Sequence, residues 1–481
     1  MNRDPAGSLP SRLALAAGWF AFFCLTALLY TPYLEAPYFS DDFLFFFTPH
    51  PAHLYQYFWM PGAASHLYRP AEAILLTLIQ THYGFNTLAI HLISMAAQAT
   101  LCCAVWYAAA RLGFSRTATI IAVLLMFATQ TAAPAMLGND CMSQAVSSAL
   151  GALAVLFAAL AYLNEREKSG RSLTLLIAAS VLAFFCGLFF KETGLGLAIA
   201  IALLAFLPAY QRGGWSAGTV SMIRRMIPYA ILTGVYVALR MSSGRQLSGQ
   251  GNYRIGLGFN VVKNLAQYAL AILTPASSVT AAVASQERDY ATLLLIGLGL
   301  LLVAGVAAIG IWRTPRGLAT LLLTCIGCAM FPAVVLQHAS ELYVYNAAPY
   351  AALLLGYAFA TLWARAGAWR IAAVICVVLL AGAQLIAVRQ KGSLMNGNGE
   401  RAQALLGPLV QYIHQAPAGG DIVLTKDLNP LPEYSVYLLN GVNVLEFGCE
   451  NLGAIFGRPD VRVHIEPKAS LSSIAPHEPR M

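Results

Sequence analysis

The stretch YFSDDFLFFF, residues 38–47, sets two adjacent carboxylates, Asp41 and Asp42, among six aromatic side chains. An ionised carboxylate needs water, a cation or hydrogen-bond donors, so a pair of them is costly to place beside a membrane. The stretch therefore predicts a functional acidic site at a membrane interface. The alternative is a helix N-cap formed by Ser40 or Asp41, which is compatible with chemistry at the same residues.

The composition around this stretch is that of a membrane protein. Of the 481 residues, 58% are hydrophobic and 10% are charged, whereas a soluble domain has about 25% charged residues. The formal net charge is +8, but the basic residues are scattered rather than gathered in one patch, which argues against a nucleic-acid partner. The predicted fold class is an all-α bundle that crosses the bilayer many times.

Hydropathy predicts about eleven transmembrane helices. A signal peptide is the alternative for the first apolar run, but no small-x-small cleavage pattern follows it, so we expect a retained first span. The eleven runs cover residues 13–31, 87–110, 118–134, 141–163, 173–190, 194–210, 226–241, 292–312, 318–336, 347–364 and 371–388.

Alternating these spans from a cytoplasmic N-terminus puts most of the basic loop residues on one side, as the positive-inside rule requires. The long loop at residues 32–70 then lies outside, and the amphipathic stretch Phe259 to Pro275 is expected to be an outer interfacial helix rather than a span. We expect a bacterial inner (plasma) membrane protein whose active site and C-terminal domain face the periplasm.

Charges of both signs gather on this outer side. Solvated loop ends are one interpretation, but Lys191 and Glu192 lie in a turn with almost no other polar residues. Basic residues beside an acidic patch suit a phosphate-bearing lipid substrate, because Lys and Arg neutralise phosphate. The outer-side polar residues that we single out are Asp41, Asp42, Arg69, Asn139, Asp140, Lys191, Glu192, Arg240 and Glu341.

The composition becomes polar after residue 388, which predicts two domains. We expect a transmembrane domain at residues 1–390 and a small α/β domain at residues 391–481 outside the membrane. The second domain should begin with a polar linker, continue with a helix at about residues 400–415 and a strand at residues 421–425, and end in a mobile Pro-rich tail.

The order of these motifs resembles the GT-C membrane glycosyltransferases, over about residues 13–390. The nearest pattern is that of the protein O-mannosyltransferase and tetratricopeptide-type O-mannosyltransferase branch. Three features depart from it: Leu342 stands where relatives often carry Arg, Gln98 stands where a second His is common, and no 34-residue repeat follows the last span. The motifs that carry the resemblance are Asp41-Asp42, Tyr68-Arg69-Pro70, His91, Asn139-Asp140, Lys191-Glu192 and Glu341-Leu-Tyr-Val-Tyr345.

The resemblance implies transfer of a hexose or pentose from a polyprenyl-phosphate donor to an acceptor on the outer face, with inversion. An inverting transfer needs a base for the acceptor hydroxyl and a group that stabilises the leaving phosphate. We expect Asp41 to be the base. Asp42 would orient it or, with Asp140, hold a divalent cation such as Mg or Mn.

The resemblance also implies a set of substrate-binding residues. Arg69, Lys191 and Arg240 would face the lipid phosphate, and Glu192 would orient Lys191 by ion pairing. Asp140 would be a second acidic group near the acceptor. The remaining expected contacts to substrate are His91, Asn139, Glu341 and Tyr345.

Two other classes of function stay open. A transporter or flippase of a lipid-linked sugar predicts inverted repeats and charges near the middle of the spans. A non-catalytic component of an envelope-glycan assembly system would not require an intact acidic pair. The acceptor, whether glycan, lipid or protein, is not specified by residue types.

Overall fold

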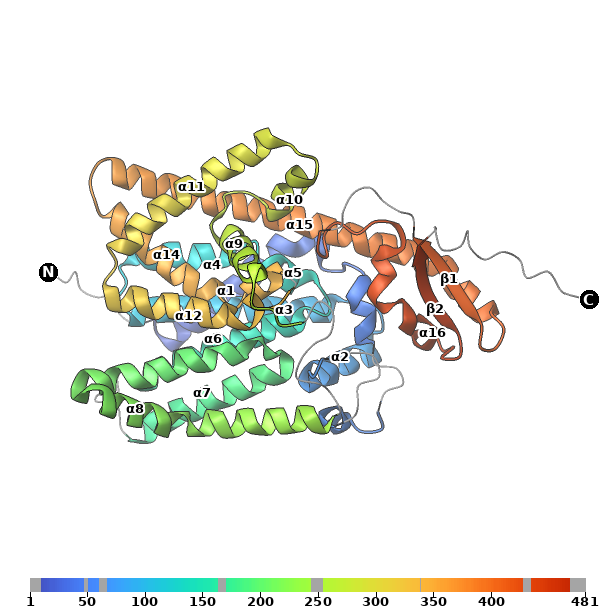
Figure 1. Ribbon diagram of the computed structural model, residues 1–481, viewed down its shortest axis with the longest axis horizontal. Helices are drawn as coiled ribbons and strands as arrows, with labels where there is room; N and C mark the ends of the chain where they lie inside the picture. The colour runs from blue at the N-terminus through green and yellow to red at the C-terminus, as the bar shows by residue number, and fades with distance from the viewer. Residues whose placement is uncertain are drawn as a thin grey trace, which may run out of the picture.

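The computed structural model describes residues 10–46, 51–59, 67–162, 170–243, 254–337, 339–426 and 434–467. It is a long helical bundle with a small sheet beyond one end (Figure 1). The Pro-rich tail that was expected to be mobile begins at residue 468 and lies outside the described residues.

Seven helices in the described ranges are long and apolar enough to cross a membrane. Three shorter apolar helices accompany them: α4 (Arg116–Ala128), α12 (Arg316–Val334) and α14 (Ala348–Trp363). The chain therefore has the character of an integral membrane protein. The seven are α1 (Arg12–Tyr30), α3 (Leu88–Arg111), α6 (Met142–Tyr162), α7 (Gly170–Phe190), α8 (Leu197–Ser242), α11 (Tyr290–Trp312) and α15 (Ala368–Gln415).

Each of the eleven predicted apolar runs coincides with one of these helices or with part of one. Two of the runs are the arms of α8, which bends back at Gly213 and Gly214, where the backbone leaves helical geometry. Gly214 has a φ of 73°, a conformation that glycine adopts without a steric cost. The number of helices that actually cross the bilayer stays a prediction.

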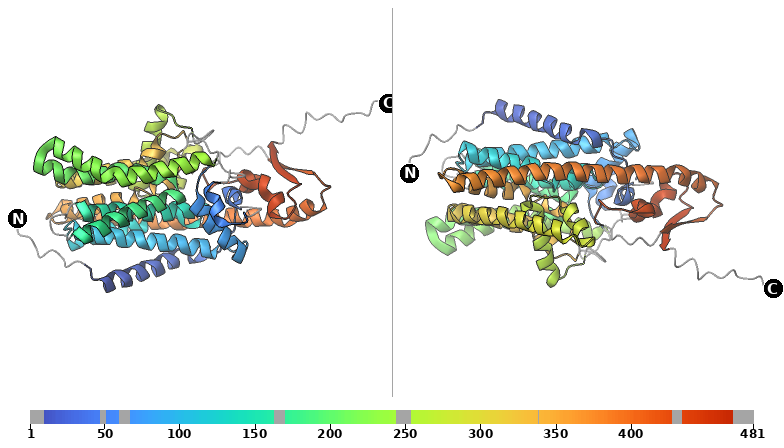
Figure 2. Two further views of the ribbon diagram at one scale, coloured as in Figure 1. Left: turned by 90° about the horizontal axis from the view of Figure 1, so that it is seen from below. Right: turned by 90° about the horizontal axis from the view of Figure 1, so that it is seen from above.

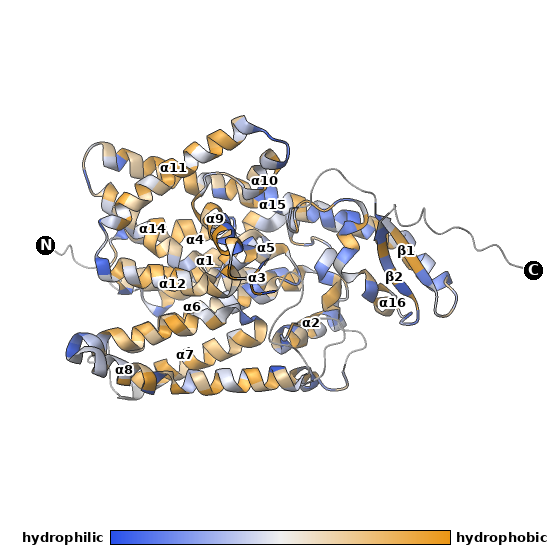
Figure 3. Cartoon of the chain, viewed as in Figure 1, coloured by the Kyte–Doolittle hydropathy of each residue, from blue (hydrophilic) through white to orange (hydrophobic). Residues whose placement is uncertain are grey.

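Helix α14 lies at the centre of the bundle and contacts α4, α11, α12 and α15. Small residues make these contacts close. A Cβ at Gly356 would lie 2.6 Å from the Cβ of Ala122, and one at Gly310 would lie 2.7 Å from the carbonyl oxygen of Ala358. Close backbone approach at small residues is how membrane helices gain packing energy where lipid supplies no hydrophobic drive. The helices of the bundle consist mostly of apolar residues (Figure 3).

Short elements gather toward the end of the bundle that faces the sheet, and these carry the acidic stretch (Figure 1). The helix expected at residues 259–275 is present as α9, and its position in a membrane interface stays a prediction. These elements are η1 (Thr31–Tyr33), η2 (Ser40–Phe45), η3 (Leu54–Phe58), α2 (Pro70–Tyr83), α5 (Ala132–Leu137), η5 (Glu192–Gly196), α9 (Phe259–Leu273), α10 (Ser278–Gln286) and α13 (Glu341–Val344).

The C-terminal part contains a two-stranded parallel sheet, β1 (Asp421–Lys426) and β2 (Arg462–Pro467). Between the strands lie η7 (Gly441–Asn451) and α16 (Leu452–Ile455). The linker expected after residue 390 is absent from this described stretch, because α15 runs unbroken from the bundle to Gln415 (Figure 2). The sequence suggested a linker because glycines lower helix propensity.

Tertiary packing explains why α15 continues through its glycines. A Cβ at Gly392 would lie 2.5 Å from the ring of Tyr33, and one at Gly399 would lie 2.6 Å from the carbonyl oxygen of Pro37. Both glycines are buried against the chain that leads to the acidic stretch. Their lack of a side chain lets α15 support that segment directly.

Candidate functional site

The acidic pair lies on η2, a six-residue 3-10 helix. Its first residue, Ser40, has a φ of 51°, in the left-handed region that non-glycine residues rarely adopt. Phe43 and Phe45 of the same element are buried. Burial of these aromatic rings fixes the element against the protein, and the two carboxylates follow directly after the left-handed residue.

Asp42 is buried and accepts three hydrogen bonds. Its Oδ2 accepts from the backbone nitrogen of Phe39 at 3.0 Å and from Nδ2 of Asn139 at 2.9 Å, while its Oδ1 accepts from the backbone nitrogen of Asp140 at 3.0 Å. Burial and the charge of Asp140 raise the pKa of Asp42, and the three hydrogen bonds lower it. The arrangement makes Asp42 the anchor between η2 and the turn before α6.

Asp41 is less engaged than its neighbour. The Ser40 hydroxyl donates to Asp41 Oδ1 at 3.3 Å, and the side chain is only half-buried. Burial and the charge of Asp140 raise the pKa of Asp41 to about 7, against the opposing effects of Lys191 and Arg69. A partly exposed carboxylate that titrates near neutral pH is suited to accept a proton.

Ion pairs join the start of α2 to the start of η5. Arg69 Nη1 lies 3.5 Å from Glu72 Oε2, and Arg69 Nε lies 3.6 Å from Glu192 Oε2. Glu192 was expected to pair with its neighbour Lys191; it pairs with Arg69 instead, because the Tyr68-Arg69-Pro70 corner brings the guanidinium to it. Arg240, at the end of α8, is buried and interacts electrostatically with Glu192.

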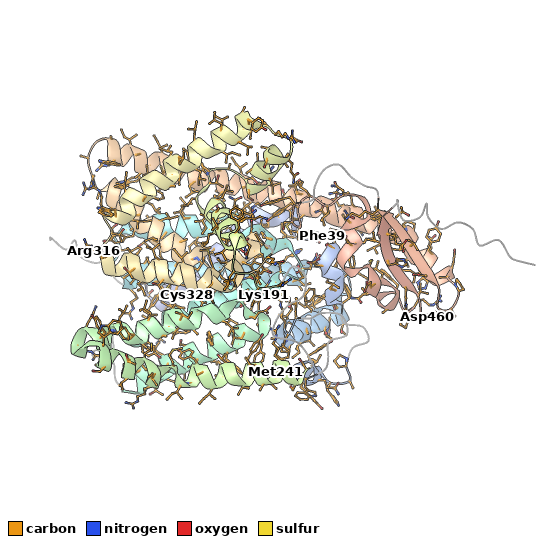
Figure 4. The ribbon with its side chains drawn as sticks, in the orientation of Figure 1. Phe39, Lys191, Met241, Arg316, Cys328 and Asp460 are labelled. Carbon is orange, nitrogen blue, oxygen red and sulfur yellow. The ribbon has the colours of Figure 1, made fainter. Side chains whose placement is uncertain are left out.

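Lys191 is buried between α7 and η5, with its ammonium 5.6 Å from the ring centre of Tyr343. Among the described residues, no carboxylate forms an ion pair with it at 4.0 Å or less. Burial and the neighbouring charge of Arg69 lower the pKa of Lys191, while Asp140 and Glu72 raise it. Lys191 and Phe39 both lie toward the sheet end of the bundle, and Arg316 lies at the opposite end (Figure 4).

Two of the expected substrate contacts lie inside the bundle. His91 is fully buried on α3, where its Nδ1 is 2.7 Å from the carbonyl oxygen of Leu34. Tyr345 is also fully buried and donates its hydroxyl hydrogen to Oε1 of Gln98. Both side chains tie α3 to adjacent segments, and their hydrogen bonds go to protein groups other than the acidic pair.

Glu341 belongs to a second polar cluster. Its carboxylate forms an ion pair with Lys391 of α15, and it accepts hydrogen bonds from the hydroxyls of Tyr434 at 3.1 Å and Tyr437 at 3.4 Å. Lys391 is fully buried. This cluster connects α13, α15 and the C-terminal segment, so Glu341 here binds protein groups.

The sequence placed Glu72 on the outer side without a role in the site, and it gave no indication of Lys391. Glu72 is completely buried, and burial raises its pKa to about 7 while Arg69 lowers it. Pro70 marks the start of a helix, so the sequence could have placed Glu72 in the first helical turn, next to Arg69. For Lys391 no such signal exists, since its partner lies 50 residues away.

The expected metal site has few protein ligands. The described residues contain no group of three or more His, Cys, Asp or Glu side chains that could hold a metal ion. Both oxygens of Asp42 already accept hydrogen bonds from Asn139 or the backbone. Mg²⁺ is often held by one or two carboxylates together with substrate phosphate, so a cation held in that way stays a prediction.

The structure resembles solved membrane transferases. No protein-family model matches the chain, and no curated protein matches its sequence. ArnT from Cupriavidus metallidurans bound to undecaprenyl phosphate aligns with a TM-score of 0.53 and 14% identity, over 95% of this chain and 91% of ArnT. The apo form of ArnT gives a TM-score of 0.50 and 12% identity, over 88% and 84%.

A weaker likeness is found to the archaeal oligosaccharyltransferase AglB from Archaeoglobus fulgidus, with a TM-score of 0.46 and 13% identity, over 78% of this chain and 56% of AglB. ArnT and AglB are GT-C superfamily glycosyltransferases. The O-mannosyltransferase branch suggested by the motifs has no specific counterpart among them and stays a prediction. The likeness to ArnT shows that this chain has the fold of a GT-C membrane glycosyltransferase.

Proposed function

We propose that the chain is an inverting membrane glycosyltransferase that moves a sugar from a polyprenyl-phosphate donor to an acceptor on the outer face of a bacterial inner membrane. The observation that carries the proposal is that Asp41 and Lys191 lie close enough for the charge of Lys191 to lower the pKa of Asp41, although the two form no ion pair. Asp41 is a half-buried carboxylate with a pKa near neutral, and Lys191 is a buried ammonium that has no ion-pair partner in the described chain. A base and an anion-binding group at one end of a membrane bundle are what such a transfer requires.

The bonds change in one displacement. The acceptor hydroxyl transfers its proton to Asp41 as its oxygen attacks the anomeric carbon of the donor sugar. The bond between that carbon and the phosphate oxygen breaks, and the lipid phosphate leaves with the bonding electron pair. Attack opposite the leaving group inverts the anomeric centre, and the extra negative charge on the phosphate is stabilised by Lys191.

The neighbouring residues prepare these two groups. Asp42 holds η2 against Asn139, which fixes the position of Asp41. Arg69 and Arg240 add positive charge, although Arg69 is already paired with Glu72 and Glu192. The bound undecaprenyl phosphate in the ArnT structure supports a lipid-phosphate donor for a chain of this fold.

The proposal is tested by measuring transfer with purified protein in detergent. Labelled polyprenyl-phosphate hexose or pentose is supplied with a mixed acceptor extract, with and without EDTA. We compare the wild type, Asp41→Asn, Asp42→Asn and the control Glu287→Gln, whose side chain is exposed on the loop after α10. Transfer by the wild type and the control, with its loss in Asp41→Asn while donor binding persists, is the expected result.

Two other outcomes would point elsewhere. Equal transfer by all four proteins would remove Asp41 from the chemistry. The transporter would be favoured if none of the four proteins transferred sugar, although they bound the donor and moved the lipid-linked sugar across vesicle membranes. Loss of transfer in EDTA that Mg²⁺ or Mn²⁺ restores would establish the predicted cation.

A further inference from the structure

The acidic element η2 cannot hold its own conformation. It has only six residues, and it begins at Ser40 with a φ of 51°. A residue in the left-handed region costs about 1–3 kcal/mol and persists only where the surroundings enforce it. Asp42 supplies one restraint from the side of the bundle through Asn139 and Asp140. A second restraint is found on the opposite side.

That second restraint comes from η7 of the C-terminal part, which packs directly on η2. Gly448 of η7 faces the backbone of Phe43, so that a Cβ at this glycine would lie 2.9 Å from both the Cα and the carbonyl carbon of Phe43. Asn451 Nδ2 donates a hydrogen bond to the carbonyl oxygen of Phe43 at 3.2 Å. Phe43 is two residues from Asp41 and its side chain is fully buried.

The segment before η7 is itself fixed to the membrane bundle. Asn398, buried on α15, donates to the carbonyl oxygens of Val436 at 2.7 Å and Tyr437 at 3.2 Å. The Glu341–Lys391 ion pair binds the hydroxyl of Tyr437 as well. Buried polar contacts of this kind are costly to leave unsatisfied, which makes the attachment specific. The segment that leads into η7 is therefore held by contacts that do not involve η2.

We propose that Gly448 and Asn451 are positioning residues for the proton-accepting carboxylate, so that the C-terminal part is a component of the active site. They act through Phe43: the glycine admits the η2 backbone, and the asparagine holds its carbonyl group. The inference rests on the proposed function for its effect on catalysis. The physical relationship that it asserts, that η7 holds η2 in place, is measurable without substrate.

The test compares Gly448→Ala with Gly397→Ala, since a Cβ at Gly397 on α15 would meet nothing within 4 Å. Hydrogen exchange of the backbone amides of residues 39–45 is measured first. We expect the exchange rates in this segment to rise at least about tenfold in Gly448→Ala and to stay unchanged in Gly397→Ala. Catalytic turnover should fall by about tenfold to a hundredfold in Gly448→Ala, with donor affinity within about twofold of wild type, because small misplacements of a catalytic group have effects of this size.

A second variant covers the case in which Gly448→Ala does not fold. Asn451→Asp keeps the shape of the side chain but replaces the donating amide with a carboxylate that repels the Phe43 carbonyl. It should also raise the exchange rates of residues 39–45 selectively, and it should lower turnover by about threefold to tenfold. A uniform rise in exchange over the whole chain, or a loss of donor binding equal to the loss of turnover, would mean that both residues merely stabilise the fold and would overturn the proposal.

The two proposals fail in different ways. If the wild type transfers no sugar but exchange at residues 39–45 still rises selectively, the positioning by η7 stands and the glycosyltransferase assignment falls. If the wild type transfers sugar and both variants leave the exchange of residues 39–45 unchanged, only the positioning role of Gly448 and Asn451 falls.

Discussion

Asn139 donates a hydrogen bond to Asp42 at 2.9 Å across a separation of 97 residues, and so joins η2 to the turn before α6. This contact gives the two aspartates different roles, since the carboxylate of Asp42 holds the two segments together. Its neighbour Asp41 keeps a carboxylate that is only half-buried. The two aspartates should therefore respond differently to the same substitution.

Asp42→Asn should lower stability, because its amide cannot accept all three hydrogen bonds that the carboxylate accepts. A buried donor left without an acceptor costs about 1–3 kcal/mol. Asp41→Asn should not lower the unfolding temperature, and it should lower turnover by about 10² to 10⁴, the usual contribution of a general base. Thermal unfolding and transfer assays on both variants test the difference; equal unfolding temperatures for the two would contradict it.

Transfer should depend on pH through Asp41. Its pKa is raised to about 7, chiefly by burial and by Asp140, and only the ionised form accepts a proton. Activity should therefore rise as the pH increases through about 7 and level off above it. The measurement is kcat/KM for the acceptor from pH 5 to 9. A profile that is flat below pH 7 would show that another group is the base.

The same raised pKa has an opposite consequence for stability. Because the folded protein holds the Asp41 proton more tightly than the unfolded chain does, stability should decrease as the pH rises from about 4 through about 7. Asp41→Asn removes this titration and should flatten that part of the profile. Denaturation in detergent across this range is the measurement, with Glu287→Gln as the control; parallel profiles for wild type and Asp41→Asn would contradict the raised pKa.

Lys191→Met should weaken donor binding without destabilising the protein. The variant keeps the apolar stem and removes a buried charge that forms no ion pair with any described carboxylate. A hydrogen bond to a charged group contributes about 1.5–3 kcal/mol, so donor affinity should fall by about tenfold to a hundredfold. Lys263→Met, on the exposed side of α9, serves as the control. Unchanged donor affinity in Lys191→Met would remove Lys191 from the phosphate site.

Lys391→Met should destabilise the chain strongly, because it leaves the Glu341 carboxylate without its ion-pair partner. Removal of one member of a buried pair costs about 3–5 kcal/mol. Adding Glu341→Gln to the same protein should restore much of that loss, since no uncompensated charge then remains. A double-mutant cycle of unfolding free energies measures the coupling, and additive effects would show that the pair is not coupled.

The sequence predicted a site on the outer side from the polar residues at the ends of its apolar runs, and this position stays a prediction. Asp41, Asn139 and Lys191 each follow or precede an apolar run, and runs that alternate across a bilayer bring such ends to one side. Their meeting in the structure is a consequence of that topology. Hydropathy also located the helices, because membrane spans require long apolar segments.

The pairing of individual side chains could not be predicted in this way. Hydropathy places His91 on a helix without saying which neighbour it faces, and the structure directs it to the carbonyl of Leu34. The partner of Glu192 depends on the corner at Arg69, which comes from another part of the chain. Lys391 lies in a stretch whose glycines suggested a linker, and only contact with Tyr33 and Pro37 explains why it is helical.

Helix α15 runs from the bundle to the sheet as a single rod of 48 residues. At 1.5 Å per residue it is about 72 Å long, more than twice the roughly 30 Å thickness of a hydrocarbon core. A rod of this length acts as a lever, because a small change of tilt within the bilayer becomes a larger displacement at its far end.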